Sequence, residues 1–158
     1  MGYKQEAGVS PYMSQQALRL KVARKARKVC TRVFVYGTLK EGEWNNRILA
    51  SSERLTETKT LTKFALGDVG FPYAFPPSAV PVEYDHLLYP VMGEVFEVHT
   101  DKVFANLDTL EGFPSHYDRS IVDLESGHRA WMYFQPDWTN ASWCDVCKLE
   151  EGAWSWPA

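Results

Sequence analysis

The sequence predicts an α+β domain in which short strands accompany one well-defined helix. Residues 33–36 form an apolar, β-branched and aromatic run that stops at Gly37, the pattern of a buried strand. Residues 100–111 carry apolar side chains at helical spacing between a capping threonine and a glycine. Residues 117–122 and 129–135 flank a glycine-containing turn, as a strand pair does. With 158 residues, 45% of them hydrophobic, the chain suffices for one packed domain with appendages.

The first 30 residues differ in charge from the rest of the chain. They carry seven Lys and Arg against one acid, Glu6, whereas the remainder carries ten basic and nineteen acidic residues. Residues 1–13 are expected to form a polar arm, and residues 14–28 a helix that Ser14 caps. The predicted apolar stripe of this helix consists of Ala17, Leu18, Val22, Ala26 and Val29.

The other face of that helix is strongly cationic, which leaves several uses open. It can be solvated or pack on the domain, or it can contact nucleic acid, a membrane surface or a protein partner. The acidic remainder of the chain argues against nucleic-acid binding by the domain itself. Nucleic acid is therefore expected, if at all, only at the basic arm 1–30.

Apolar runs and cysteines indicate the compartment. No apolar run approaches the ~18 residues of a membrane helix, and the N-terminus lacks the apolar stretch of a signal peptide. The three cysteines, Cys30, Cys144 and Cys147, do not suggest a disulfide framework. Cys144 and Cys147 lack an evident second pair of zinc ligands and the context of a redox motif, so chance pairing is favoured over a metal or redox site. We expect a cytoplasmic protein without a metal site.

The segments around the main helix are less regular. In order, we expect a short helix that includes 47–49, a partly strand-forming stretch at 52–66, a glycine- and aromatic-rich loop at 67–73, and a proline-rich irregular stretch at 76–90. A strand follows at 91–99, in which Gly93 marks a bulge or a close neighbour. The tail from residue 137 on contains four of the six Trp and is expected to pack on the domain.

The turn from Tyr36 to Leu39 is the first candidate site. Gly37 allows the backbone to turn sharply, and Thr38 and Leu39 then bring main-chain N–H groups toward one point. Convergent N–H groups of this kind can bind an anion. The alternative is an ordinary strand end with a glycine turn.

Glu111, the last residue of the predicted helix, is the second candidate site. It lies ~20° from Phe104 and ~40° from Leu107 around the helix axis, whereas Asp108 is expected off this apolar stripe. Burial and the negative end of the helix dipole should both raise the pKa of the Glu111 carboxyl. A carboxyl with a pKa near the operating pH suits general acid–base catalysis. Alternatively, Glu111 caps a neighbouring N–H or pairs with Arg119.

Two tyrosines can complete a site between these features. In the strand 129–135, Trp131 and Tyr133 are expected to face one way and Ala130 and Met132 the other. Tyr117 and Tyr133 line the site if their strands flank it. An N–H cradle, a carboxylic acid and tyrosines suit proton transfer on a small polar substrate held by its own carboxylate.

Five segments carry a resemblance to a known family. In chain order they are VFVYGTLKEGEWNNRIL, LGDVGFPYAF, GEVFEV, LDTLEGFPSHYDR and AWMYF. They resemble the γ-glutamylcyclotransferase superfamily, most closely its γ-glutamylamine cyclotransferase and AIG2-like branch. YGTL followed by LxxLEGxPxxYxR is the specific part of this signal. The resemblance covers residues 32–136, which leaves a basic arm at 1–30, a domain at 31–136 and a Trp-rich extension at 137–158.

The resemblance implies a fold, a reaction and roles for single residues. The fold is a small mixed β-barrel with packed helices and one cavity, and no cofactor is implied. The α-amine of a γ-glutamyl group attacks that group's own γ-carbonyl, which forms 5-oxoproline and expels the amine it carried. Glu111 matches the family's acid/base glutamate, and Tyr117 its motif tyrosine. The substrate-binding loop matches Tyr36, Gly37, Thr38 and Leu39. A non-catalytic module that sequesters a small ligand on the same fold is the alternative.

Overall fold

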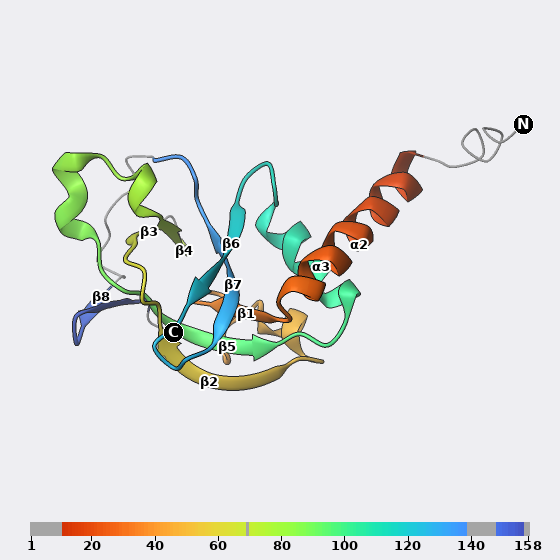
Figure 1. The fold of residues 1–158 in the computed structure, drawn as a ribbon, viewed down its shortest axis with the longest axis horizontal. Helices are drawn as coiled ribbons and strands as arrows, with labels where there is room; N and C mark the ends of the chain where they lie inside the picture. Colours follow the sequence, from red (N-terminus) through yellow and green to blue (C-terminus); the bar gives the residue numbers. More distant parts are fainter. Residues whose placement is uncertain (1–10, 69, 139–147, 157–158) are drawn as a thin grey trace, which may run out of the picture.

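A computed structural model describes residues 11–68, 70–138 and 148–156. At its centre lies a five-stranded mixed sheet with the strand order β2-β5-β1-β7-β6 (Figure 1). β1 (Arg32–Val35) pairs antiparallel with β5 (Met92–Glu97) and parallel with β7 (Arg129–Phe134). β2 (Glu53–Lys59) and β6 (Asp118–Asp123) are the outer strands. The predicted α+β class and the predicted strand pair are confirmed.

The two outer strands meet at one end of the sheet. Thr60, directly after β2, forms an antiparallel bridge with Leu124, directly after β6. The Leu61 N–H donates to the Asp123 carbonyl over 3.0 Å, and the Glu125 N–H donates to the Lys59 carbonyl over 2.9 Å. The sheet therefore curves enough to join its edges at this end.

Close packing between β1 and β5 depends on Gly93. A Cβ atom at this position would lie 2.4 Å from the Val35 carbonyl oxygen and 2.6 Å from the Phe34 ring. The predicted close neighbour of Gly93 is thus confirmed. On β7, the predicted alternation is also confirmed, because Tyr133 belongs to one buried cluster while Ala130 and Met132 belong to the other.

The segment predicted as a loop at 67–73 is instead part of a hairpin. β3 (Ala65–Asp68) and β4 (Pro72–Phe75) pair antiparallel, and every residue of both strands is buried. Strands buried on both faces lack the alternation of apolar and polar residues that identifies a strand in a sequence. The glycines of this segment therefore favoured the prediction of a loop. Three short 3₁₀ helices occupy other irregular stretches: η1 (Asn46–Leu49), η2 (Pro77–Ala79) and η3 (Val82–Leu87).

The helix α3 (Asp101–Glu111) has the predicted ends. The Thr100 hydroxyl accepts a hydrogen bond from the Val103 N–H, and Gly112 ends the helix with a φ of 68°. The helical spacing of apolar residues, which includes Leu110 and leaves Asp108 off the apolar side, predicts burial only partly, because Leu110 is 39% exposed whereas Asp108 is 3% exposed. Asp108 can be buried because a side chain of opposite charge, Arg119 on β6, pairs with it.

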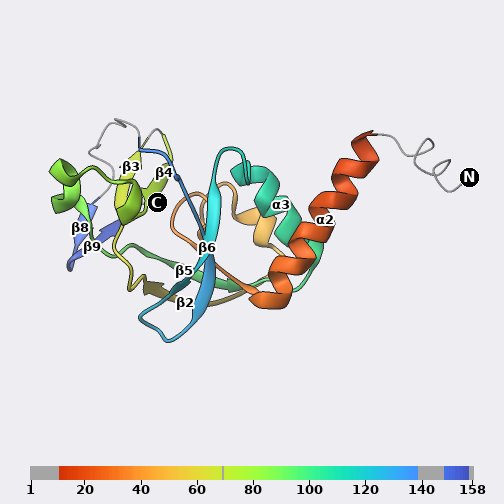
Figure 2. The same ribbon diagram turned by 45° about the horizontal axis from the view of Figure 1, so that its top comes forward.

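The helix α2 (Pro11–Val29) begins three residues before the predicted cap, so Ser14 does not cap it. A proline suits the first turn of a helix, where its missing N–H costs no hydrogen bond. The second half of α2 packs on α3 through Ala23 and Ala26, and Arg19 in the first half donates to the Thr109 hydroxyl of α3 over 3.4 Å. The start of α2 extends past the body of the protein (Figures 1 and 2).

The predicted stripe of α2 is right for Ala26, which is buried, and for Val22, which is partly buried, and wrong for its other three residues. Ala17 is exposed, Leu18 is 59% exposed and Val29 is 70% exposed, so these residues lie away from the side of α2 that packs. The side that packs is centred on Ala23 and Ala26, so small residues rather than large ones set the contact with α3.

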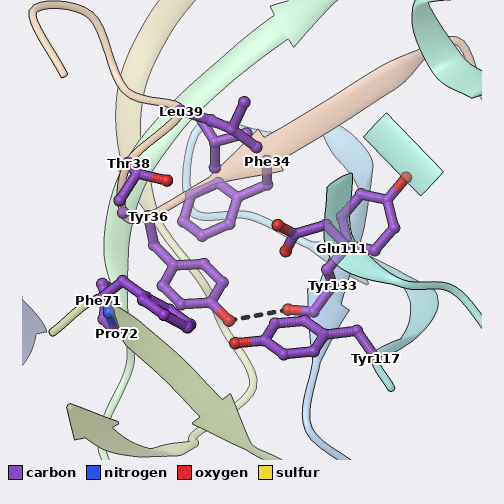
Figure 3. A pocket seen from close by; sticks show the side chains of 11 residues that line it. Phe34, Tyr36, Thr38, Leu39, Phe71, Pro72, Glu111, Tyr117 and Tyr133 are labelled. Atoms are coloured by element: carbon purple, nitrogen blue, oxygen red, sulfur yellow. Dashed lines mark hydrogen bonds between the residues drawn. The ribbon is translucent and has the colours of Figure 1, made fainter. Parts of the chain in front are cut away.

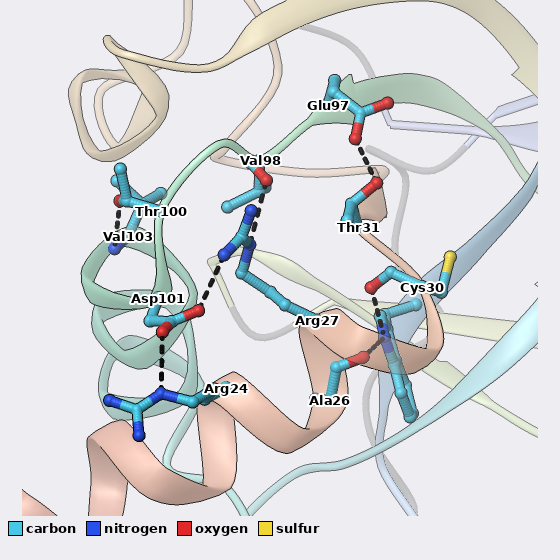
Figure 4. A network of polar contacts seen from close by, with 11 residues as sticks. Arg24, Ala26, Arg27, Cys30, Thr31, Glu97, Val98, Thr100, Asp101 and Val103 are labelled. Atoms are coloured by element: carbon cyan, nitrogen blue, oxygen red, sulfur yellow. Dashed lines mark hydrogen bonds and ion pairs between the residues drawn. The ribbon is translucent and has the colours of Figure 1, made fainter.

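Polar contacts fix the second half of α2 (Figure 4). Arg24 and Arg27 both pair with Asp101 at the start of α3, at 3.2 Å and 2.7 Å. Arg27 Nε also donates to the Val98 carbonyl over 3.1 Å. The Trp131 indole N–H on β7 donates to the carbonyls at the end of α2, those of Ala26 and Cys30. Packing on the domain is thus observed for this half, whereas contact with another molecule stays a hypothesis.

The hairpin β8 (Lys148–Glu150) and β9 (Ala153–Ser155) lies at the end of the molecule away from α2 (Figure 2). The Trp154 indole N–H donates to the Leu87 carbonyl, and Lys40 Nζ donates to the Trp156 carbonyl over 2.7 Å. Cys144 and Cys147 lie outside the described residues. Within the described ranges, no helix has the length and apolar character to span a membrane.

Candidate active site

A small cavity lies where the end of β1, the end of α3 and the β3–β4 hairpin come together (Figure 3). Its volume is about 40 Å³. The structure brings every site residue expected from the sequence to this one cavity. It is lined by Phe34, Val35, Tyr36, Gly37, Thr38, Leu39, Phe71, Pro72, Glu111, Tyr117 and Tyr133.

The main chain of the turn after β1 offers unused donors to this cavity. Among the hydrogen bonds of the described residues, none has the N–H of Gly37, Thr38 or Leu39 as its donor. The next N–H groups are used, since Lys40 N–H donates to Gly37 O and Glu41 N–H donates to a Glu94 carboxylate oxygen. Three adjacent unpaired N–H groups in a cavity wall can receive an anion or a developing negative charge.

Two asparagines that the sequence did not single out as site residues hold this turn. The Asn45 side chain donates to the Thr38 hydroxyl over 2.9 Å, and its main-chain N–H donates to the Thr38 carbonyl over 3.0 Å. The Asn46 side chain donates to the Leu39 carbonyl over 2.9 Å. A Cβ atom at Gly37 would lie 2.8 Å from Pro72 Cγ, so glycine allows the turn to approach the hairpin.

The Glu111 carboxyl points into the cavity, toward Phe34 and Tyr36 (Figure 3). It makes no hydrogen bond and no ion pair with the described residues. Burial raises the pKa of this carboxyl from 4.5 to about 7. The alternative that Glu111 pairs with Arg119 is wrong, because Arg119 binds both oxygens of Asp108, at 2.9 Å and 3.1 Å.

The three tyrosines have different roles in the cavity wall. The Tyr36 hydroxyl donates to the Tyr133 carbonyl over 2.9 Å and accepts from the Ala74 N–H over 3.0 Å. The Tyr133 hydroxyl donates to Asp108 over 2.5 Å, so only its ring faces the cavity. The Tyr117 hydroxyl makes no hydrogen bond with the part of the chain that the structure describes, which leaves it available to a ligand. Burial raises the pKa of all three phenols, so each is a neutral hydroxyl near neutral pH.

Glu111 should make the stability of the protein depend on pH. Its folded-state pKa of about 7 exceeds the unfolded value of 4.5, so the folded state retains this proton to a higher pH. Stability should therefore fall as pH rises from ~4.5 to ~7, by up to ~3 kcal/mol from this one group. Chemical unfolding at pH 5 and pH 8 measures this loss, and Glu111→Gln should remove it.

The matched control is Glu125→Gln, which makes the same chemical change at a side chain that is 60% exposed. This variant should show the same pH dependence as the unchanged protein. A Glu111→Gln variant whose stability falls between pH 5 and pH 8 as steeply as that of the unchanged protein would contradict the raised pKa.

Comparison with known families assigns this chain to a family. The family described as "Gamma-glutamyl cyclotransferase, AIG2-like" matches residues 33–155, which include β1 from its second residue, the turn after it, Glu111 and β9. The chain belongs to this family. The matched range extends beyond the segment of resemblance at 32–136 into the Trp-rich tail, whereas α2 lies outside it.

Sequence relatives of this gamma-glutamyl cyclotransferase family member come from distant organisms. A provisionally named gamma-glutamylcyclotransferase of Methanocaldococcus jannaschii is 37% identical over 110 residues, which cover 66% of this chain and 84% of that protein. A relative with the same provisional name from Drosophila melanogaster is 38% identical over 116 residues, which cover 67% of this chain and 70% of its own. These alignments support the assignment to the family.

Solved structures share the fold. A crystal structure of an uncharacterized Pyrococcus horikoshii protein aligns with a TM-score of 0.55 and 22% identity, over 70% of this chain and 82% of that one. An AIG2-like protein from Mus musculus aligns with a TM-score of 0.54 and 24% identity, over 70% and 80% of the two chains. At these identities the likeness concerns the fold alone.

Proposed function

We propose that this family member catalyses intramolecular aminolysis of a γ-glutamyl amine or amino acid, with release of 5-oxoproline and the free amine. One observation carries the proposal. The Glu111 carboxyl and the N–H groups of Gly37, Thr38 and Leu39, which have no hydrogen-bond partner among the described residues, belong to residues that line the same small cavity. The reaction needs a general acid/base that transfers protons and hydrogen-bond donors that bind an anion.

The reaction begins with the α-amine of the glutamyl group. Ionised Glu111 accepts a proton from the α-ammonium group, and the freed amine attacks the γ-carbonyl carbon to close a five-membered ring. The carbonyl oxygen then carries negative charge, which the Tyr117 hydroxyl can stabilise by donating a hydrogen bond. Protonated Glu111 gives its proton to the leaving nitrogen, the original C–N bond breaks, and the amine departs. The ring nitrogen then still carries one proton more than the lactam, which ionised Glu111 accepts and passes to the departing amine, so that the products are a lactam with a neutral nitrogen and an ammonium ion.

One carboxyl group can perform both transfers because of its pKa. At a pKa of about 7 the Glu111 carboxyl is populated in both forms near neutral pH. General acid–base catalysis by such a group contributes ~10²–10⁴-fold. Since nucleophile and electrophile belong to one molecule, the remaining task of the protein is to hold the glutamyl chain in a folded geometry.

The turn after β1 is proposed to hold the α-carboxylate of the substrate. The N–H groups of Gly37, Thr38 and Leu39 can donate to it, and the Tyr117 hydroxyl can donate to the same group or to the γ-carbonyl. Tyr36 and Tyr133 are proposed to line the cavity with their rings, since their hydroxyls bind protein atoms. The chemistry proposed here requires no cofactor. A cytoplasmic location and a separate role for the 1–30 arm stay predictions.

The function is tested by incubating the full chain with a panel of γ-glutamyl amines and γ-glutamyl amino acids. The proposal predicts equal amounts of 5-oxoproline and free amine from at least one compound, without free glutamate. Tight binding by calorimetry without any product would instead favour the module that sequesters a small ligand. Formation of glutamate would indicate hydrolysis and would also contradict the proposal.

A further inference from the structure

A buried ion pair lies directly behind the candidate active site. The side chains of Asp108 and Arg119 are only 5% and 6% exposed, and two hydrogen bonds join them. The Arg119 guanidinium also lies over three aromatic rings, those of Phe113 at 3.8 Å, Trp131 at 4.9 Å and Phe104 at 5.2 Å. Such a guanidinium is held in one orientation by both its charge and its flat faces.

This pair connects the elements that form the cavity wall. Asp108 lies three residues before Glu111, one helical turn back along α3. Arg119 on β6 lies opposite Tyr133 on β7, and the Tyr133 hydroxyl donates to the same Asp108 carboxylate. The last turn of α3 is thereby attached to two strands of the sheet. The main chain of this helix end is closed separately, by hydrogen bonds from the Gly112 and Phe113 N–H groups to the Asp108 carbonyl, so the ion pair acts on the position of the whole turn relative to the sheet.

The N-terminal helix α2 contacts one of the aromatic rings that lie over Arg119. Trp131, one of the rings over Arg119, donates its indole N–H to the carbonyls of Ala26 and Cys30 at the end of α2. The α2 helix lies outside the residues that the family matches. The second half of α2 thus binds the Trp131 indole, and the Trp131 ring lies over Arg119. In this way α2 contacts the residues behind the site.

We propose that the Asp108–Arg119 pair is a positioning unit for Glu111, which fixes the last turn of α3 and supplies no net charge to the cavity. The part of this inference that concerns catalysis rests on the proposed function. The titratable groups that face Glu111 are Tyr36 on β1, Tyr117 before β6 and Tyr133 on β7, all neutral near pH 7. Among the described residues of α3, β1, β6 and β7, Asp108 and Arg119 form the buried ion pair, and their two charges offset one another.

The test removes one charge of the pair at a time and measures the protonation of Glu111 directly. Carbon-13 NMR of labelled Glu carboxyl groups, assigned by comparison with Glu111→Gln, follows this titration without any enzymatic assay. Asp108→Asn leaves the Arg119 cation unopposed, so the midpoint of Glu111 should fall by ~0.5 pH unit or more. Arg119→Met leaves a carboxylate unopposed, so the midpoint should rise by a similar amount.

Two further variants keep the test decisive. In the double variant Asp108→Asn/Arg119→Met the net charge is zero again, so the midpoint should return toward that of the unchanged protein. Asp123→Asn is the matched control, since it breaks an exposed ion pair with Arg129 in the same β6–β7 hairpin and should leave the midpoint unchanged. If Arg119→Met does not fold, Asp108→Asn alone decides the direction.

The inference is overturned if Asp108→Asn folds and leaves the Glu111 midpoint where it was or raises it. In the proposed reaction, Asp108→Asn should also lower kcat about tenfold or more while KM changes by less than about threefold, because the loss is one of positioning. Opposite shifts of the two single variants in a protein that forms no 5-oxoproline would support the charge arrangement and defeat the proposed function. The two claims can therefore fail separately.

Discussion

Glu111→Gln is expected to lower the rate of 5-oxoproline formation by ~10²–10⁴-fold while the protein stays folded. The substitution removes the only group that we propose to accept and return a proton, and it keeps the size of the side chain. Folding should not suffer, because the Glu111 carboxyl makes no hydrogen bond or ion pair with the described residues that an amide would lose. At pH 8 the variant should even be the more stable protein.

Steady-state kinetics with one good substrate, together with circular dichroism and thermal unfolding, measures both parts of this expectation. Glu125→Gln serves as the matched control, since the same chemical change at an exposed ion pair with Lys59 should leave turnover unaltered. Turnover of Glu111→Gln within about twofold of the unchanged protein would remove Glu111 from the mechanism.

Gly93→Ala is expected to destabilise the fold by ~3 kcal/mol or more. The added methyl group would lie 2.4 Å from the Val35 carbonyl oxygen and 2.6 Å from the Phe34 ring, so β1 and β5 would have to separate. Overpacking of a core typically costs ~1–3 kcal/mol, and the contact with main-chain atoms places this case at the upper end. Since β1 leads directly into the turn at Gly37, its displacement should also disturb the cavity.

Chemical unfolding measures this loss, and Gly127→Ala is the comparison. Gly127 has a φ of 92° but nothing within 4 Å of a built Cβ atom, so its replacement carries only the cost of the backbone conformation. That cost is ~1–2 kcal/mol. Equal destabilisation by both substitutions would show that crowding between β1 and β5 is not what fixes glycine at position 93.

Features set by neighbouring residues were predictable from the sequence. The Thr100 cap and the Gly112 end of α3 depend on local hydrogen bonds and on one backbone conformation, and both were found as expected. The strand pair β6–β7 follows from alternating side chains around one turn. The turn after β1 and Glu111 were singled out because a glycine stop and a carboxylate on an apolar face are local departures from an ordinary strand and helix.

Features that depend on distant neighbours were not predictable in the same way. Asp108 is buried because Arg119, Tyr133 and Phe104, which belong to separate elements, come together on its side of α3. The direction of the Tyr133 hydroxyl follows from that pairing. Leu18 was expected in an apolar stripe but is 59% exposed, because helix periodicity contains no information about which side of a helix a neighbouring element covers.

The most direct test of the account is a crystal structure of Glu111→Gln with an uncleaved γ-glutamyl amine. The account predicts that the α-carboxylate of the ligand accepts hydrogen bonds from the N–H groups of Gly37, Thr38 and Leu39. It also predicts that the α-amine lies within ~2.6–3.2 Å of the side chain at position 111, where the proton must pass. A glutamyl group bound away from this turn, or with its α-amine directed away from position 111, would contradict the proposed mechanism.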